Sequence, residues 1–376
     1  MKKFLALGTL VALAACSHNN SITGIAADRA ADVGVSAVAV AADAPGAVFA
    51  LTNQVAGNSV AIYVRAADGT LTWAGSVATG GTGAGSGLGS QGALALSDDG
   101  RWLFAVNAGS NDISAFRVSP RGLTLTSRVA SGGVRPISLT AHGDVLYVLN
   151  AGGDGNISGF TVGGGGALTA IAGSTRPLSG SAVGPAQVAF SPSGRWLIVT
   201  EKSTNRLDVY AVGDDGVAAA ATTSASAGGT PFGFAFGHGG ELFVSEAAGS
   251  ASSYVIGHDG QLTTASGAVL THQGAPCWAV VTTNGKFGYT ANAQGGSISG
   301  FAIRNDGSIG LIDADGRTAV VGPGNIDLAL TGNSRYLYEL NGNRSISGFR
   351  VEADGHLQLV GNIAGLPAST VGLAAR

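Results

Sequence analysis

One pattern recurs seven times along this chain, about every 48 residues, and each recurrence carries the same three markers. An apolar run ends in Asn or Glu, a second run carries Tyr or Phe, and an Asp-Gly-type turn precedes a third run. The closing residue of the first run is in turn Asn53, Asn107, Asn150, Glu201, Glu246, Asn292 and Asn341. An all-β repeat of this length is typical of a propeller blade with four antiparallel strands. The sequence therefore predicts an all-β, seven-bladed β-propeller over residues 34–376.

One blade can be traced in full between residues 92 and 129. Its expected strands cover residues 93–97, 102–107, 113–118 and 123–129, and Gly and Asp occupy turns between them. At the C-terminus, residues 371–374 form one more apolar run that no second run follows. We expect this run to pair with the first blade, because ring closure removes the exposed strand edges. Residues 37–40 are the alternative closing strand.

The first 15 residues have the features of a signal peptide. Lys2 and Lys3 precede an apolar run over residues 4–13, which is too short to span a bilayer. Residues 13–16 read Leu-Ala-Ala-Cys and resemble a bacterial lipobox, in which Cys16 is lipidated; an ordinary signal peptide is the alternative. We expect residues 16–33 to form a tether and the protein to be lipid-anchored at the cell envelope. Ser17 favours the outer membrane, facing the periplasm.

The composition bounds the partners of this chain. Its formal charge is −3 and only 11% of its residues are charged, so we expect no binding to nucleic acid and membrane contact only through the lipid anchor. The glycine-rich tract at residues 80–89 predicts a flexible connection, because no helix pattern follows it as in a phosphate-binding loop. No cofactor or metal motif is present, and we expect a monomer without either.

The propeller topology places the candidate functional residues at one mouth of the central channel. Each inner strand starts on the face to which the second strand returns, so the closing residues and the Gly-x-Pro segments share that face. Glu201 and Glu246 replace Asn in adjacent blades, and His272 precedes an inner strand; these are the catalytic candidates. Alternatively, each Glu accepts turn hydrogen bonds or pairs with Lys202 or Arg206, and His272 is an exposed loop residue. The expected substrate-binding side chains are Arg135, Gln187, Lys202, Trp278 and Asn292.

Several motifs point to a known family. Residues 191–199 read SPSGRWLIV, residues 345–351 read SISGFRV, and an Asp-Gly-x-Leu turn follows at residues 354–357. Together with the Gly-x-Pro segments, these motifs resemble the seven-bladed lactonase propellers, a family that includes a 6-phosphogluconolactonase, across residues 34–376. Members with lactonase activity carry a Pro-His-x-His-like element before the inner strand of blade four. Residues 184–188 read Gly-Pro-Ala-Gln-Val here, so the resemblance implies a divergent branch.

Two functions remain open at this point. The first is hydrolysis of a lactone or a related small acidic sugar derivative, which is a carboxylic-ester hydrolase reaction. Glu201 or Glu246 would activate water, and Arg135 or Lys202 would hold the substrate anion. The second is a non-catalytic propeller that binds an envelope protein or glycan. The sequence leaves open whether the chain is an enzyme.

Overall fold

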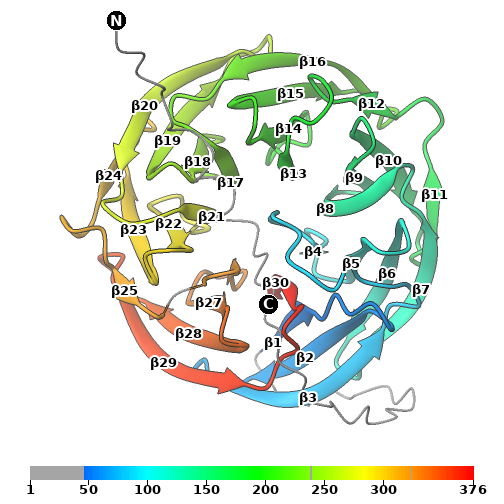
Figure 1. Cartoon of the computed structure of the whole chain (residues 1–376), viewed down its shortest axis with the longest axis horizontal. Helices are drawn as coiled ribbons and strands as arrows, with labels where there is room; N and C mark the ends of the chain where they lie inside the picture. Colours follow the sequence, from blue (N-terminus) through cyan, green and yellow to red (C-terminus); the bar gives the residue numbers. More distant parts are fainter. Residues whose placement is uncertain (1–45, 238, 323) are drawn as a thin grey trace, which may run out of the picture.

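The computed structural model describes residues 46–376 except positions 238 and 323. Seven antiparallel sheets stand around a central axis as the blades of a ring (Figure 1). This arrangement confirms the predicted seven-bladed β-propeller. The signal peptide, Cys16 and the alternative closing run at 37–40 lie outside the described residues. Within the described part of the chain, no helix has the length and apolar character needed to cross a membrane.

Blades 1 to 4 follow one another around the ring. Blade 1 joins the last strand, β30 (Val371–Ala375), to β1 (Gly46–Leu51), β2 (Ser59–Arg65) and β3 (Leu71–Ala78). Blade 2 consists of β4 (Leu94–Leu96), β5 (Trp102–Asn107), β6 (Asp112–Ser119) and β7 (Gly122–Ala130). Blade 3 consists of β8 (Val134–His142), β9 (Val145–Gly152), β10 (Asn156–Val162), β11 (Leu168–Ala170) and β12 (Arg176–Pro177). Blade 4 consists of β13 (Pro185–Phe190), β14 (Trp196–Glu201), β15 (Arg206–Val212) and β16 (Ala218–Ala225).

Blades 5 to 7 complete the ring. Blade 5 consists of β17 (Pro231–Phe236), β18 (Leu242–Glu246), β19 (Ser250–Ile256) and β20 (Leu262–Leu270). Blade 6 consists of β21 (Pro276–Val281), β22 (Phe287–Asn292), β23 (Ser297–Ile303), β24 (Ile309–Leu311) and β25 (Ala319–Val320). Blade 7 consists of β26 (Asp327–Leu330), β27 (Tyr336–Asn341), β28 (Ser345–Val351) and β29 (Leu357–Ala364). In blades 3 and 6 the outer strand is split into two short strands, which both pair with the third strand.

The C-terminal strand closes the ring, as the sequence predicts. Strand β30 is the inner strand of blade 1 and pairs antiparallel with β1, with Ala374 opposite Phe49. On its other side, the backbone amide of Leu373 donates to a carboxylate oxygen of Asp327 in blade 7 at 2.9 Å. The first and last blades are therefore joined by hydrogen bonds on both sides of β30.

The Asp-Gly-type turns fasten neighbouring blades together. The buried hydroxyl of Tyr338 in blade 7 donates to the carbonyl of Gly69 in blade 1 at 2.7 Å. Gly69 has φ +88°, and a Cβ there would lie 2.4 Å from the ring of Tyr336. Equivalent bonds join Tyr147 to Gly216 and Tyr289 to Gly355. Glycine is needed at such turns because it alone combines left-handed backbone with this close approach.

A glycine-rich segment between β3 and β4 crosses the central channel (Figure 1). We call residues 85–92 the channel loop. The Ser90 hydroxyl donates to the carbonyl of Ile137 in blade 3 at 2.8 Å, and the Gln91 amide donates to the carbonyl of Ala186 in blade 4 at 3.1 Å. The Gln91 side chain bonds both backbone groups of Ala279 in blade 6, at 2.7 and 2.9 Å. The expected flexible connection is therefore an anchored loop that contacts three blades.

Candidate functional site

Glu246 is held by donors of its own blade. It ends β18, and its side chain is fully buried. Its carboxylate accepts hydrogen bonds from the Gly228 amide at 2.7 Å and from the hydroxyls of Ser226, Ser250 and Ser252 at 3.0, 2.6 and 2.6 Å. These donors lie in the segment that enters blade 5 and in β19. Four donors satisfy the buried charge, and this geometry favours a structural role.

Glu201 lies in a similar environment at the end of β14 and is also fully buried. Its carboxylate accepts from the Ser179 amide at 2.9 Å, from the Ser179 hydroxyl, and from the Thr204 hydroxyl at 2.6 Å. Asp208 is buried beside it. Burial raises the pKa of Asp208 to about 7; Glu201 adds to this effect and a hydrogen bond from Thr223 opposes it. Two cavities, of about 250 and 290 Å³, lie at this mouth of the channel, and neither Glu201 nor Glu246 lines either of them.

Three other expected site residues also lie away from these cavities. Asn292 is fully buried, and its amide donates to two serine hydroxyls of β23 at 3.0 and 2.9 Å. Gln187 joins blades 4 and 5 by bonding both backbone groups of Phe234, at 2.7 and 3.1 Å. His272 is exposed and has a left-handed backbone, with φ 58°. None of these three residues is a hydrogen-bond partner of the Glu201 or Glu246 carboxylate among the described residues.

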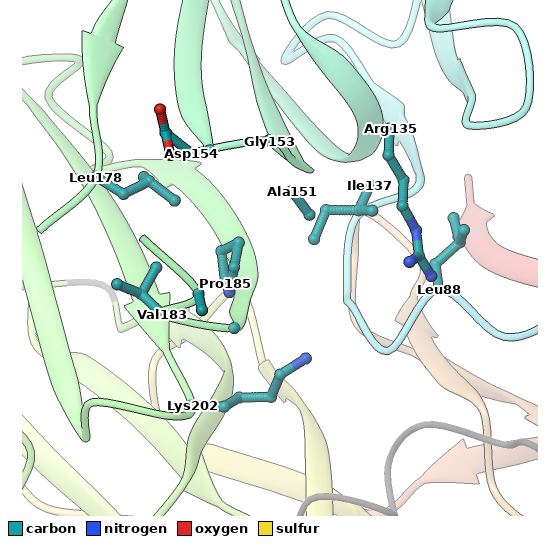
Figure 2. A pocket seen from close by; sticks show the side chains of 13 residues that line it. Leu88, Arg135, Ile137, Ala151, Gly153, Asp154, Leu178, Val183, Pro185 and Lys202 are labelled. Carbon is teal, nitrogen blue, oxygen red and sulfur yellow. The ribbon is translucent and has the colours of Figure 1, made fainter. Parts of the chain in front are cut away.

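Arg135 and Lys202, in contrast, meet in one cavity of about 250 Å³ at the channel mouth. Arg135 lies on β8 of blade 3, and Lys202 follows β14 of blade 4. Figure 2 shows that the charged ends of both side chains point into the same space. Apolar walls come from Leu88 of the channel loop and from Ile137, Leu178 and Val183. We call this space, lined by Arg135 and Lys202 between blades 3 and 4, the first cavity.

Lys202 is held at the edge of the channel loop. Its ammonium donates to the carbonyl of Gly89 and lies 5.0 Å from the ring centre of Phe232. The side chain is half-buried. Burial, assisted by the positive charge of Arg135, lowers the pKa of Lys202 to about 8. A protonated Lys202 is therefore short of compensating charge, and an anion in the cavity would stabilise it.

The Arg135 guanidinium has no anionic partner in the part of the chain that the structure describes. Its backbone is fixed by a left-handed φ of 56° and by an amide hydrogen bond to the Asn111 side chain at 2.7 Å. Across residues 46–376, leaving aside 238 and 323, neither Arg135 nor Lys202 forms an ion pair. Asp154 is the acidic side chain of this lining, and in Figure 2 its carboxylate points away from Lys202. The first cavity therefore presents excess positive charge.

A second cavity of about 290 Å³ lies on the other side of the channel loop. Residues 85–90 form one wall, and Gly342, Arg344 and residues 368–371 form the opposite one. Trp278, an expected substrate-binding residue, lines this cavity. It is 3% exposed, and its indole nitrogen donates to the Ser90 carbonyl at 3.0 Å, so it also positions the channel loop.

Sequence reasoning did not identify the channel loop or Asp154 as parts of the site. The glycine tract is the available signal for the loop, because an insertion of small residues before an inner strand can enter a narrow channel. In the described residues no three His, Cys, Asp or Glu side chains gather closely enough to hold a metal ion. Thus the chemistry that the arrangement supports is binding of an anion by two basic side chains.

The sequence matches the family described as lactonase, 7-bladed beta-propeller, over residues 51–183 and 242–325. These segments make up more than half of the chain and include Arg135, Asp154 and the channel loop. Lys202 lies outside the matched segments. No curated protein matches the chain in sequence.

Solved structures share the fold at low sequence identity. A proposed 6-phosphogluconolactonase of Bacteroides fragilis is 19% identical with a TM-score of 0.67, and the alignment covers 89% of this chain and 98% of that one. A periplasmic gluconolactonase of Pseudomonas aeruginosa is 17% identical with a TM-score of 0.69, over 88% and 99% of the two chains. A Lactobacillus plantarum protein is 20% identical with a TM-score of 0.70, over 88% and 99%. At such identities the likeness concerns the fold alone.

Proposed function

This chain belongs to the lactonase family of seven-bladed β-propellers, and we propose that it hydrolyses a small lactone that carries an anionic group. The observation that supports this function is the convergence of Arg135 and Lys202 in the first cavity without a carboxylate partner among the described residues. A lactone with a phosphate or carboxylate group would supply the missing negative charge. The cavity walls formed by Leu88 and Ile137 would enclose its ring.

The two basic side chains divide the chemistry between them. Water adds to the lactone carbonyl, and negative charge develops on the carbonyl oxygen. The ring C–O bond then breaks, and the proton released by the water passes to the ring oxygen, which gives a hydroxy acid. Lys202 is half-buried, so its ammonium would stabilise this oxyanion more strongly than an exposed lysine would. Arg135 is exposed at the entrance and would hold the substrate's anionic group. Hydrolysis would thus rest on electrostatic stabilisation rather than on the buried glutamates.

Rates of lactone hydrolysis test this proposal. The full-length protein in detergent is assayed by pH-stat with 6-phosphogluconolactone and with uncharged gluconolactone. We expect turnover of the anionic lactone, and Lys202→Gln should lower kcat roughly 100-fold, the usual cost of removing one oxyanion donor. Arg135→Gln should mainly raise KM. Arg121→Gln is the matched control, because this exposed arginine lies in the β6–β7 turn, at the end of blade 2 that faces away from the mouth with the first cavity.

The outcomes separate the hydrolase from the alternative. No turnover above the spontaneous rate, with both lactones and at several protein concentrations, would refute the hydrolase proposal. Binding of the product 6-phosphogluconate without turnover would instead favour a non-catalytic propeller. Equal losses in the Arg121→Gln control would show that general surface charge, and not the first cavity, sets the rate.

We also propose that a lipid on Cys16 holds the protein at the outer membrane, facing the periplasm, as a monomer. The support is the Leu-Ala-Ala-Cys sequence at residues 13–16 and the following Ser17. The periplasmic location of the gluconolactonase from Pseudomonas aeruginosa agrees with this placement. Cys16→Ser should release the protein from membranes; unchanged fractionation and unchanged mass would overturn the assignment.

A further inference from the structure

The second cavity contains a basic side chain that the proposed reaction does not use. Arg344 follows β27 and is exposed, and no hydrogen bond or ion pair of its guanidinium to another described residue is present. Its backbone has a left-handed φ of 70°, and its amide donates a hydrogen bond to the Asn341 carbonyl at 3.1 Å. Its carbonyl accepts hydrogen bonds from the amides of Gly365 and Leu366. The structure therefore holds a second arginine at a set place on this mouth.

The two cavities are neighbours separated by the channel loop. Leu88 lines both of them. Gly89 lines the second cavity, and its carbonyl accepts the hydrogen bond from Lys202, which lines the first. Gly89 therefore binds the Lys202 ammonium of the first cavity and also lines the second cavity. The two cavities therefore adjoin at Leu88 and Gly89.

Cavity size favours a ligand that occupies both spaces. Ligand sites usually enclose about 300–1,000 Å³. The cavities measure about 250 and 290 Å³, so each alone is smaller than such a site, whereas the two together fall within the range. Each space is suited to one sugar-sized ring.

Basic side chains line both cavities, so a ligand that occupies both would be complementary if it carried an anionic group at each end. Arg135 and Lys202 line the first cavity, Arg344 lines the second, and Asp154 is the acidic side chain of the two linings. This excess of positive charge lies on a chain whose formal charge is −3. A basic surface on an acidic protein concentrates anionic ligands at that place.

We propose that the two cavities form one bipartite site for a disaccharide-sized acidic sugar, with one anionic group at Arg135 and Lys202 and a second at Arg344. The ligand is identified by its chemistry as a diuronate, two linked sugar rings that each carry a carboxylate. The glycine-rich wall of the channel loop lets the linkage between the rings pass close to the backbone. This inference rests on the anion-binding role of the first cavity in the proposed function and extends it to a longer ligand.

Calorimetric titration of the full-length protein in detergent with galacturonate and with digalacturonate tests this inference. Digalacturonate should bind at least tenfold more tightly, because the second carboxylate gains a charge-assisted hydrogen bond. Arg344→Gln should reduce digalacturonate affinity to the level of galacturonate and leave galacturonate unchanged. Arg344→Lys should keep part of the difference, and Arg135→Gln should weaken both ligands. Arg121→Gln again serves as the matched control.

Two results for the Arg344→Gln variant would overturn the bipartite site. One is a digalacturonate affinity that Arg344→Gln leaves unchanged while its melting temperature is also unchanged; the other is an equal loss for both ligands in that variant. If neither ligand binds the wild-type protein, the bipartite site is rejected. Selective loss of digalacturonate binding in Arg344→Gln, combined with no lactone turnover, would support the site while refuting the hydrolase. Binding and turnover therefore report on the two proposals separately.

Discussion

At the scale of single residues, most of the polar side chains at this mouth of the channel have structural roles, whereas Arg135, Lys202 and Arg344 line cavities. Glu246 accepts four hydrogen bonds, and Asn292 donates to two serine hydroxyls in the equivalent place of blade 6. The serine hydroxyls of β19 donate hydrogen bonds to Glu246, whereas those of β23 accept hydrogen bonds from Asn292. Blade 5 therefore has an acceptor, Glu, at the position where blade 6 has a donor, Asn. Among the described residues, Arg135 and Lys202 form no ion pair, and both line the first cavity.

Replacement of Glu246 by Gln should lower the free energy of unfolding by about 1–3 kcal/mol, because an amide NH₂ would face the hydroxyl and amide donors that the carboxylate now satisfies. Affinity for 6-phosphogluconate should remain at the wild-type value. Thermal unfolding and calorimetric titration measure the two quantities. Glu352→Gln, at an exposed ion pair with Arg350, is the control and should change stability by less than about 1 kcal/mol. If Glu246→Gln loses affinity for 6-phosphogluconate at an unchanged melting temperature, Glu246 has a functional and not a structural role.

Affinity for an anionic ligand should depend on pH through Lys202. Burial, with a smaller effect of Arg135, lowers the pKa of this lysine to about 8, so the ammonium is charged below that pH and loses its charge above it. The Kd for 6-phosphogluconate should therefore be steady near pH 7 and rise above pH 8, where the attraction is lost. Arg135→Gln removes a like charge and should move this transition to higher pH, although binding is weaker overall. A wild-type Kd that stays constant to pH 10 would contradict the role of Lys202.

At the scale of secondary-structure elements, the blades were predictable and the channel loop was not. The markers of the repeat are local: Trp102–Asn107 was expected as a strand and is β5, and the unpartnered C-terminal run is β30. The channel loop is held by contacts between residues far apart in sequence, such as the bonds of Gln91 to Ala279. Many of its contacts use backbone groups, which every residue carries, so the glycine tract indicates an insertion but not the residues to which the loop is anchored.

The closing strand should carry a large share of the stability. Deletion of residues 365–376 removes β30 and leaves the inner edge of β1 unpaired, together with the Asp327 carboxylate that Leu373 now satisfies. We expect a melting temperature far lower than the loss of a frayed end would produce, because the buried carboxyl group of Asp327 would lose a hydrogen-bond donor and the core of blade 1 would be exposed. Differential scanning calorimetry of the truncated protein gives the answer. Melting at the wild-type temperature would show that β30 does not hold the ring closed.

At the scale of the whole molecule, seven blades of the same architecture surround a channel whose mouth is not symmetric. The ring alone would leave a channel around its axis, and the channel loop crosses it and divides the space at one mouth into two cavities. The repeat predicted which residues share this mouth, including Arg135 and Lys202. It could not predict which of them face open space, because that depends on how the loop packs between the blades.

The most direct test of this account is a crystal structure of the protein with 6-phosphogluconate, compared with the same complex of the Arg135→Gln, Lys202→Gln double variant. We expect the phosphate or the carboxylate of the ligand in the first cavity, within hydrogen-bond distance of both Arg135 and Lys202, and an empty cavity in the double variant. A ligand bound at the opposite mouth of the channel, or equal occupancy of the first cavity in both proteins, would contradict it.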